Sequence, residues 1–352
     1  MRSLPLKSPP SSLCILRLSA IGDISHALPI VRTIQTAWPG TSLTWVIGKA
    51  EYELVCDISG IEFITFDKSK RWRSYAHIRA RMRQRRFDVL LHMQMSLRAS
   101  LLSLLIPAQL KLGFDRGRAK DFQWLFTNQK IPAGARQHVI ESFFGFTDAL
   151  GITQRVLRWD IPIPNRAIAF AESSLPGDMP TLVISPCSNM SYRNWDAARY
   201  AAVADYAAEK CGMRVALTGG PSAVEHEYAR TICAAARHPI INLIGKTDLK
   251  QLLALLAKAT VVIAPDSGPA HLATAVGTPV IGLYATTNPD RARPYLSAEY
   301  VVNRYPEAVM AKHNTSADRV RWGTRVRDRG TMDRIEVNDV TRTLDKLMAK
   351  RN

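Results

Sequence analysis

The residues with the clearest chemical potential lie in the segment 266–271, which reads Asp-Ser-Gly-Pro-Ala-His. The apolar run before it predicts a buried strand that ends at Asp266. We expect a helix to begin there at once, because Ser267 can cap it and Pro269 suits its first turn. Free backbone N–H groups and the helix dipole favour a phosphate at such a point, which Asp266 and His271 flank. The segment therefore indicates a nucleotide or sugar-nucleotide site.

A second candidate group, Gly22, Asp23 and His26, follows the first apolar run of the chain. Gly22 allows a tight turn between a strand and a helix. Asp23 lies at or near the start of that helix, where a carboxylate is commonly a cap. The functional interpretation is a general base beside a ligand cleft. His26 either belongs to that site or is an ordinary packed or surface histidine.

Two loops in the second half of the chain carry groups suited to a nucleotide. Ser188, Asn189 and Arg193 follow a predicted strand and can bind phosphate oxygens. A Gly-Gly-Pro turn follows the next strand, and Glu225 beyond it can accept hydrogen bonds from ribose hydroxyls. Taken alone, each loop is also compatible with an ordinary solvated turn, so their combination carries the argument.

Strand-like and helix-like stretches alternate along the chain and position these groups. Strands are predicted at 13–18, 43–47, 63–66, 89–92, 182–185, 214–218, 240–243, 261–264 and 279–283. Helices are predicted at 25–38, from 50, and at 71–86, 97–105, 197–210, 222–236, 249–257 and 338–348. Such alternation predicts an α/β fold with helices on both faces of parallel sheets.

Proline-rich punctuation at 160–180 marks a predicted linker. We expect a Rossmann-like domain at 1–165, a second one at 166–335, and a C-terminal helix within 336–352. Two doubly wound domains in tandem predict a cleft between their carboxyl sheet edges, where ligands of such folds bind.

The chain is basic, with a net charge of +17 over 352 residues. Residues 1–165 hold 23 Lys and Arg against 12 Asp and Glu, a balance of +11. Such an excess indicates an anionic partner: nucleic acid, a phospholipid surface or a phosphorylated substrate. Five scattered cysteines without a C-x-x-C pair argue against zinc ribbons and favour a reducing compartment. No run approaches the roughly 20 apolar residues of a membrane span, and the first residues do not resemble a signal peptide. We therefore expect a cytoplasmic protein.

The basic excess peaks at residues 68–86, which hold nine Lys and Arg and no acidic residue. Like charges along a helix repel, so a purely solvated face is an unsatisfying explanation. A nucleic-acid groove usually adds aromatic platforms or a known motif. We therefore favour a phosphorylated lipid acceptor on an anionic membrane surface, with no nucleic-acid partner. Arg116, Arg118 and Lys120 extend the predicted basic surface.

The order of these motifs resembles the heptosyltransferase family of GT-B glycosyltransferases, family 9, which act in lipopolysaccharide inner-core assembly. The order is Gly-Asp with a downstream His-x-x-Pro, polar residues before Arg-x-Trp, Gly-Gly-Pro, and Asp-Ser-Gly-Pro-x-His, over residues 13–295. The resemblance implies two Rossmann-like domains with an interdomain cleft. It also implies inverting transfer from ADP-L-glycero-D-manno-heptose to the Kdo/heptose inner core at the cytoplasmic face of the inner membrane.

The resemblance assigns the catalytic base to Asp23. It assigns donor binding to Ser188, Asn189, Arg193, Glu225, Asp266, Ser267, Gly268 and His271. We expect acceptor binding by Gly22, His26, Arg79, Arg83, Arg116, Arg118 and Lys120. The family usually has Lys at the position of Arg193, which keeps the charge and alters its geometry.

The chain contains no Asp-x-Asp motif, so the metal clamp of many glycosyltransferases has no obvious ligands. Arg193 and the helix at Ser267 can neutralise a departing diphosphate instead. We therefore predict no cofactor and no essential metal. The alternatives are a related enzyme with another donor or acceptor, a sugar-nucleotide 2-epimerase, and a basic nucleic-acid-binding protein.

Overall fold

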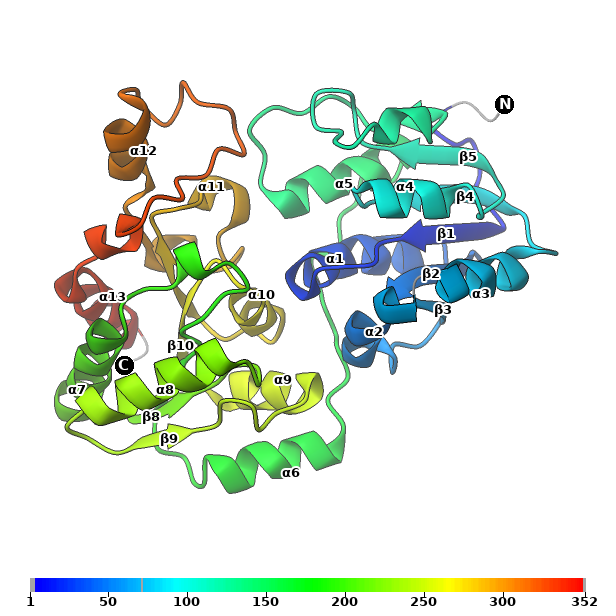
Figure 1. Cartoon of the computed structure of the whole chain (residues 1–352). Coiled ribbons are helices and arrows are strands. Elements are labelled where there is room, and N and C mark those ends of the chain that lie inside the picture. The colour runs from blue at the N-terminus through cyan, green and yellow to red at the C-terminus, as the bar shows by residue number, and fades with distance from the viewer. Residues whose placement is uncertain (1–3, 71, 351–352) are drawn as a thin grey trace. The chain divides into compact units, whose positions relative to one another are not determined.

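The computed structural model describes residues 4–70 and 72–350, and the chain divides into two compact units at residues 162 and 163 (Figure 1). Both units are α/β, as the alternation of apolar runs predicts. Among the described residues, no helix has the length and apolarity needed to cross a bilayer.

The first unit is built on a six-stranded parallel sheet in the order β3-β2-β1-β4-β5-β6. Its strands are β1 (Ser12–Leu16), β2 (Ser42–Gly48), β3 (Ile61–Phe66), β4 (Phe87–His92), β5 (Ala108–Gly113) and β6 (Gln129–Lys130). Its helices are α1 (Ile21–Ala37), α2 (Lys49–Val55), α3 (Trp72–Met82), α4 (Leu97–Ser103) and α5 (Val139–Leu150), with short 3₁₀ turns η1 (Lys68–Lys70) and η2 (Gln123–Leu125). The central strands are buried along most of their length, as parallel strands covered on both faces are.

Helices α3 and α4 cover one face of the first sheet. Ile78 and Met82 of α3 and Leu102 of α4 join one apolar cluster with residues of β1 to β4. Helix α1 packs against α2 and α5. Because the strands are parallel, the loops that follow them lie at the same edge of the sheet.

The second unit holds a parallel sheet in the order β12-β11-β10-β7-β8-β9. Its strands are β7 (Thr181–Ile184), β8 (Arg214–Leu217), β9 (Ile240–Asn242), β10 (Val261–Pro265), β11 (Val280–Tyr284) and β12 (Val301–Asn303). Its helices are α6 (Asn165–Ser174), α7 (Ala197–Cys211), α8 (Ala223–Ala235), α9 (Leu249–Lys258), α10 (Gly268–Ala275), α11 (Pro289–Ala292), α12 (Tyr305–His313) and α13 (Val337–Ala349), with 3₁₀ turns η3 (Ser191–Arg193), η4 (Ala298–Tyr300) and η5 (Thr331–Arg334).

The two sheets have the same topology. In each, the first strand of the unit lies between the second and the fourth, so the winding reverses between β1 and β4 and between β7 and β10. Ligands of doubly wound folds bind outside the carboxyl ends of the strands at such a switch point. Each unit therefore has one topologically favoured site.

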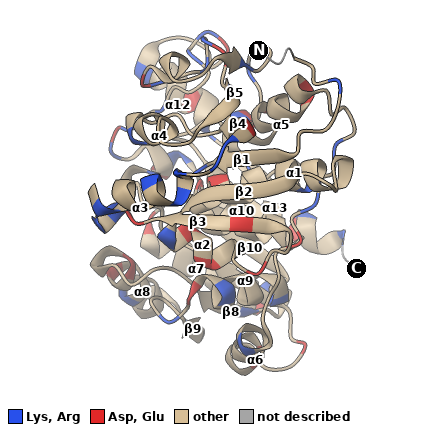
Figure 2. Ribbon diagram, turned by 90° about the vertical axis from the view of Figure 1, so that its right-hand side faces the viewer, with Lys and Arg blue, Asp and Glu red and all other residues tan. Residues whose placement is uncertain are grey.

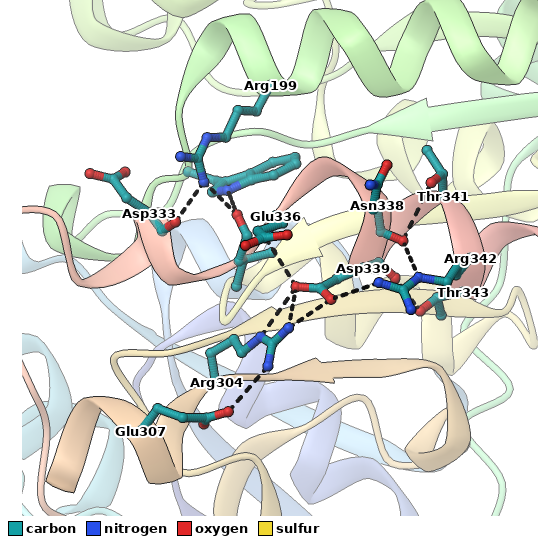
Figure 3. A network of polar contacts seen from close by, with 12 residues as sticks. Arg199, Arg304, Glu307, Asp333, Glu336, Asn338, Asp339, Thr341, Arg342 and Thr343 are labelled. Atoms are coloured by element: carbon teal, nitrogen blue, oxygen red, sulfur yellow. Dashed lines mark hydrogen bonds and ion pairs between the residues drawn. The ribbon is translucent and has the colours of Figure 1, made fainter. Parts of the chain in front are cut away.

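Helix α13 is fastened to the second unit by a polar network at its N-terminus (Figure 3). Arg304 forms hydrogen bonds of 2.7 and 2.8 Å with the carboxylate of Asp339 and one of 3.2 Å with Glu307. Arg199 donates to the carbonyl oxygens of Asp333 and Ile335. Burial raises the pKa of Asp339, but the hydrogen bonds from Arg304 and the Glu336 N–H outweigh it and lower that pKa. The network keeps the apolar face of α13 on the core.

The structure differs from the predicted elements at several ends. Helix α1 begins at Ile21, four residues earlier than predicted, and α3 ends at Met82, four residues earlier. Residues 83–86 instead form the turn that carries the chain into β4. Helix α6 occupies part of the predicted linker, where its Ala167 and Ala171 are buried. The sequence also did not predict β5, β6, β12, α5, α11 or α12.

Candidate active site

The second switch point joins two loops that are distant in sequence. Ser188 lies in the loop after β7, and Asp266 follows β10 directly. The Ser188 hydroxyl donates to the carbonyl oxygen of Asp266 at 3.2 Å, and Arg193 Nη1 donates to the same oxygen at 2.9 Å. Arg193 also pairs with the Asp266 carboxylate at 3.2 Å. The structure thus brings together Ser188, Arg193 and Asp266, as the sequence predicts for one site.

The carboxylate of Asp266 is held in a buried set of charges. His271, on α10, places Nε2 at 3.8 Å from Asp266 Oδ1. Burial raises the pKa of Asp266, but the hydrogen bond with His271 and the charge of Arg193 together bring it below the ordinary value. Asp266 is therefore a carboxylate at neutral pH, and it orients the Arg193 guanidinium and the His271 ring.

Three buried polar atoms around this point have no hydrogen-bond partner among the described residues. They are Arg193 Nε, Ser267 Oγ and the Tyr192 hydroxyl. An unsatisfied buried polar group costs roughly 1–3 kcal/mol, so a ligand that supplies partners gains that energy. Two guanidinium groups also lie near the Tyr192 ring, with Arg193 at 5.7 Å and Arg327 at 5.6 Å from its centroid. The site is suited to an anion with several oxygens.

Helix α10 presents its N-terminus to this group. Ser267 is the N-cap residue, Gly268 begins the helix and a proline follows in the first turn. The prediction that the Ser267 side chain caps the helix is wrong, because its hydroxyl makes no bond to the helix backbone. The hydroxyl and the first N–H groups therefore remain for a ligand rather than for each other.

Glu225 shapes the Gly-Gly turn after β8. Its carboxylate accepts hydrogen bonds from the Gly220 N–H and the Ser222 hydroxyl, both at 2.7 Å. A Cβ atom at Gly220 would lie 2.9 Å from that carboxylate, so a larger residue there would displace the Glu225 side chain from the turn. The ribose contact of Glu225 stays a prediction, as does phosphate binding by the exposed Asn189.

The first switch point is organised around Asp23 and Arg17. Asp23 is the third residue of α1, and its carboxylate forms an ion pair with the guanidinium of Arg17. It also accepts a long hydrogen bond, 3.4 Å, from the Ala20 N–H. Arg17 is only 7% exposed and donates to the Met93 carbonyl after β4 at 2.6 Å. The cap and the base interpretations of Asp23 are compatible, because its carboxylate accepts from the Ala20 N–H at the start of the helix and its side chain is still 37% exposed.

The turn before Asp23 is tied to β4 by Gln94. Its side-chain oxygen accepts from the Leu18 N–H at 2.6 Å and the Ser19 N–H at 3.3 Å. Sequence reasoning missed both Gln94 and Arg17. Arg17 carried a signal, since a charged residue directly follows an otherwise apolar strand; Gln94 carried none.

His26 and Gly22 are buried on α1. The His26 ring meets the His138 ring edge-on, with centroids 5.7 Å apart. His138 in turn uses Nδ1 to accept the Ile140 N–H at the start of α5. Packing is therefore the observed role of His26, and its acceptor contact stays a prediction.

The predicted acceptor cations divide into two groups. Arg79 and Arg83 are exposed and form no ion pair with another described residue. Arg118 instead pairs with Asp115, donates to Gln137 and Ser142 at 2.8 and 2.9 Å, and reaches a backbone carbonyl. Arg118 thus ties its own loop to Gln137 and to the first turn of α5, and these contacts do not support its predicted acceptor role.

Within the described part of the chain, no three His, Cys, Asp or Glu side chains gather in a way suited to a metal ion. The prediction of no essential metal and no cofactor stays a prediction.

Two Rossmann-like units, one with a carboxylate and the other with a candidate anion site at its switch point, have the architecture of a GT-B glycosyltransferase. A model of glycosyltransferase family 9 (heptosyltransferase) matches residues 75–319. The chain is 38% identical over 338 residues to the lipopolysaccharide core heptosyltransferase OpsX of Haemophilus influenzae, covering 96% of this chain and 97% of that protein. The chain therefore belongs to glycosyltransferase family 9, the heptosyltransferases.

Solved structures agree on the fold. A family 9 glycosyltransferase from Veillonella parvula superposes with a TM-score of 0.79 at 20% identity, covering 97% of each chain. Escherichia coli heptosyltransferase WaaC with ADP gives a TM-score of 0.72 at 20% identity, covering 96% of this chain and 99% of that one. The predicted family and GT-B fold are confirmed. The epimerase and nucleic-acid-binding alternatives are not supported.

Proposed function

We propose that the protein is an inverting heptosyltransferase that transfers heptose from ADP-L-glycero-D-manno-heptose to the Kdo/heptose inner core of lipopolysaccharide. The observation that carries the proposal is the anion site at the second switch point, with its unsatisfied Arg193 and Ser267 atoms. The Haemophilus relative is a lipopolysaccharide core heptosyltransferase, and the WaaC structure contains ADP. The ADP in that structure supports a nucleoside diphosphate as the ligand of this site.

In this proposal the second unit binds the donor. The diphosphate lies at the N-terminus of α10, where Arg193, Ser267 and the backbone N–H of Gly268 receive its negative charge, with Ser188 and Asn189 beside it. These donors stabilise the charge that grows on ADP as the bond to heptose breaks. Glu225 holds the ribose, and Asp266 and His271 orient the sugar.

The first unit binds the acceptor and supplies the base. Asp23 takes the proton from the acceptor hydroxyl as its oxygen attacks the anomeric carbon and ADP leaves from the opposite side. Arg17 fixes the carboxylate toward the switch point. Gly22 and His26 border this position. No metal and no cofactor take part, because Arg193 and α10 supply the charge that a metal would.

The basic surface of the first unit attracts the phosphorylated acceptor. Arg79, Arg83, Arg116 and Lys120 are all exposed. Charges of this kind favour an anionic surface, and the acceptor is a membrane lipid. We therefore place the enzyme at the cytoplasmic face of the inner membrane, with no nucleic-acid partner.

The test is a transfer assay with ADP-heptose and Kdo-bearing lipid A in the presence of EDTA, followed by mass spectrometry of the acceptor. A gain of one heptose is expected. If ADP-heptose binds but no product forms, the proposed acceptor is wrong. If ADP-heptose does not bind, the proposed donor is wrong. If product forms only without EDTA, the metal-free mechanism is wrong.

A further inference from the structure

Helix α4 buries Ser100 and Ser103 together with Ala99 and Leu102, and it leaves its other two leucines, Leu97 and Leu101, exposed. Leu97, Leu101 and the C-cap residue Leu104 share one face and are 52%, 45% and 60% exposed. Ser100 and Ser103 are fully buried beneath them. Surface helices normally turn polar side chains toward water. The outer face of α4 is therefore suited to an apolar environment.

The segment 122–125 continues this apolar face. Phe122 and Leu125 are 64% and 62% exposed, and Trp124 is 42% exposed. The N–H of Leu97 donates to the Asp121 carboxylate at 3.3 Å, which fixes the start of α4 beside the segment. Phe122 has a φ of 56°, in a backbone region that bulky residues rarely adopt. The chain thus holds a strained aromatic residue at the surface, next to the leucines.

Arginines border the apolar face. Arg98 follows Leu97 on α4, and Arg116 lies 5.0 Å from the Trp124 ring centroid. The Tyr75 hydroxyl donates to the Arg98 carbonyl at 3.4 Å, which joins α3 and its cations to the same surface (Figure 2). Arg98, Arg116 and Arg73 of α3 form no ion pair with another described residue.

We propose that α4 and the segment 122–125 form an anchor that enters the interfacial region of an anionic phospholipid bilayer. Leu97, Leu101, Leu104, Phe122 and Leu125 insert among the lipids while the arginines bind lipid phosphates. A polyanion alone would leave the leucines in water, and an uncharged apolar partner would leave the arginines uncompensated. An anionic bilayer satisfies both. The proposal extends the membrane location given under the proposed function and rests on it.

The anchor lies at the edge of the first sheet that holds the candidate base. Helix α4 begins after the carboxyl end of β4, and the segment 122–125 follows that of β5. Asp23 follows the carboxyl end of β1, which lies beside β4 in the same parallel sheet. A lipid-linked acceptor in the bound bilayer is therefore presented to the edge where its hydroxyl is to be deprotonated.

The test compares vesicle flotation of the full-length wild type with that of a Leu97→Gln, Leu101→Gln, Phe122→Gln variant. Vesicles contain phosphatidylcholine alone or mixed with phosphatidylglycerol. The matched control carries Leu296→Gln and Met310→Gln, which replace apolar side chains of similar exposure, 54% and 49%, in the second unit. Circular dichroism checks folding, and the single Phe122→Ser variant replaces the triple variant if that one fails to fold.

We expect the wild type and the control to float with the anionic vesicles and the anchor variant to lose at least about tenfold in partitioning. Retained flotation of the anchor variant, an equal loss in the control, or equal binding to neutral vesicles overturns the proposal. Transfer to a deacylated, water-soluble acceptor is measured in parallel. Transfer without wild-type flotation overturns the anchor alone, whereas flotation without transfer overturns the proposed function alone.

Discussion

The two switch points share one topology but have opposite electrostatic designs. At the first, a carboxylate, Asp23, faces outward from a buried arginine, Arg17, whose other contacts are structural. At the second, the carboxylate of Asp266 is itself buried, and it is Arg193, Ser267 and a helix N-terminus that keep unsatisfied donors. The first arrangement is suited to accepting a proton, and the second to receiving an anion. One strand order, used twice, thus supports two chemical roles.

The comparison predicts its largest effect for Asp23→Asn. If this carboxylate is the base, kcat should fall about 10²–10⁴-fold, because a general base contributes about that much to the rate. Donor affinity should stay within about twofold, because Asp23 lies in the first unit and the proposed donor site lies in the second. Steady-state kinetics and calorimetry with ADP measure the two effects. Unchanged turnover in a folded variant would remove the base role and leave Asp23 as a helix cap.

The next largest effect is expected for Arg193→Ala. The substitution removes the guanidinium from the leaving group and takes one of its partners from Asp266, so kcat should fall about 10²-fold or more and ADP should bind more weakly. Arg193→Lys should recover part of both losses, since it restores the charge without the forked geometry. Equal activity of the Ala and Lys variants would show that charge at this position does not matter, and would break the contrast between the switch points.

The sequence predicted the second switch point better than the first. Asp266, Ser267 and His271 follow one another around a strand end, so local pattern alone brings them together, and Ser188 and Arg193 follow the next strand of the sheet. The contacts around Asp23 were missed because most of them are tertiary: Arg17, whose charge after an apolar strand was the one signal, binds the Met93 carbonyl, and Gln94 binds the turn. The bonding capacity of Ser267 was misjudged, because capping propensity does not reveal where a hydroxyl points.

The sequence predicted the class of sheet but not the order of its strands. Alternating apolar runs predict parallel doubly wound sheets, but short strands such as β6 and β12 bury too few residues to stand out. The predicted helix at 71–86 runs past the observed end of α3, because the basic run continues beyond Met82, the last buried residue of the helix. Arg81 and Arg85 of that run share one acidic partner, Glu62, which lies on β3 and which periodicity does not show.

His92 offers a pH test confined to the first switch point. Burial, with the nearby charges of Lys111 and Arg17, lowers the pKa of His92 to about 3. The folded protein therefore keeps it neutral, and the stability that this confers is lost as pH falls from about 6.5 toward 3, by about 1.4 kcal/mol per pH unit. His92→Gln, which cannot titrate, should show a smaller fall in unfolding midpoint between pH 7 and pH 5. Parallel pH profiles for the two proteins would contradict the burial argument.

The smallest effect is expected outside both switch points, for Arg304→Gln in the network that fastens α13. The Asp339 carboxylate has a lowered pKa in the folded state, so its contribution is present above about pH 4 and is lost as pH falls through that lowered value. Because the Arg304 side chain is about one third exposed, we expect the substitution to cost only about 1 kcal/mol at pH 7. The difference from the wild type should shrink in acid, and ADP affinity should not change. Weaker ADP binding would mean that the anion site depends on how α13 is held. The geometry of the second switch point would then depend on contacts outside the hydrogen bonds described within it.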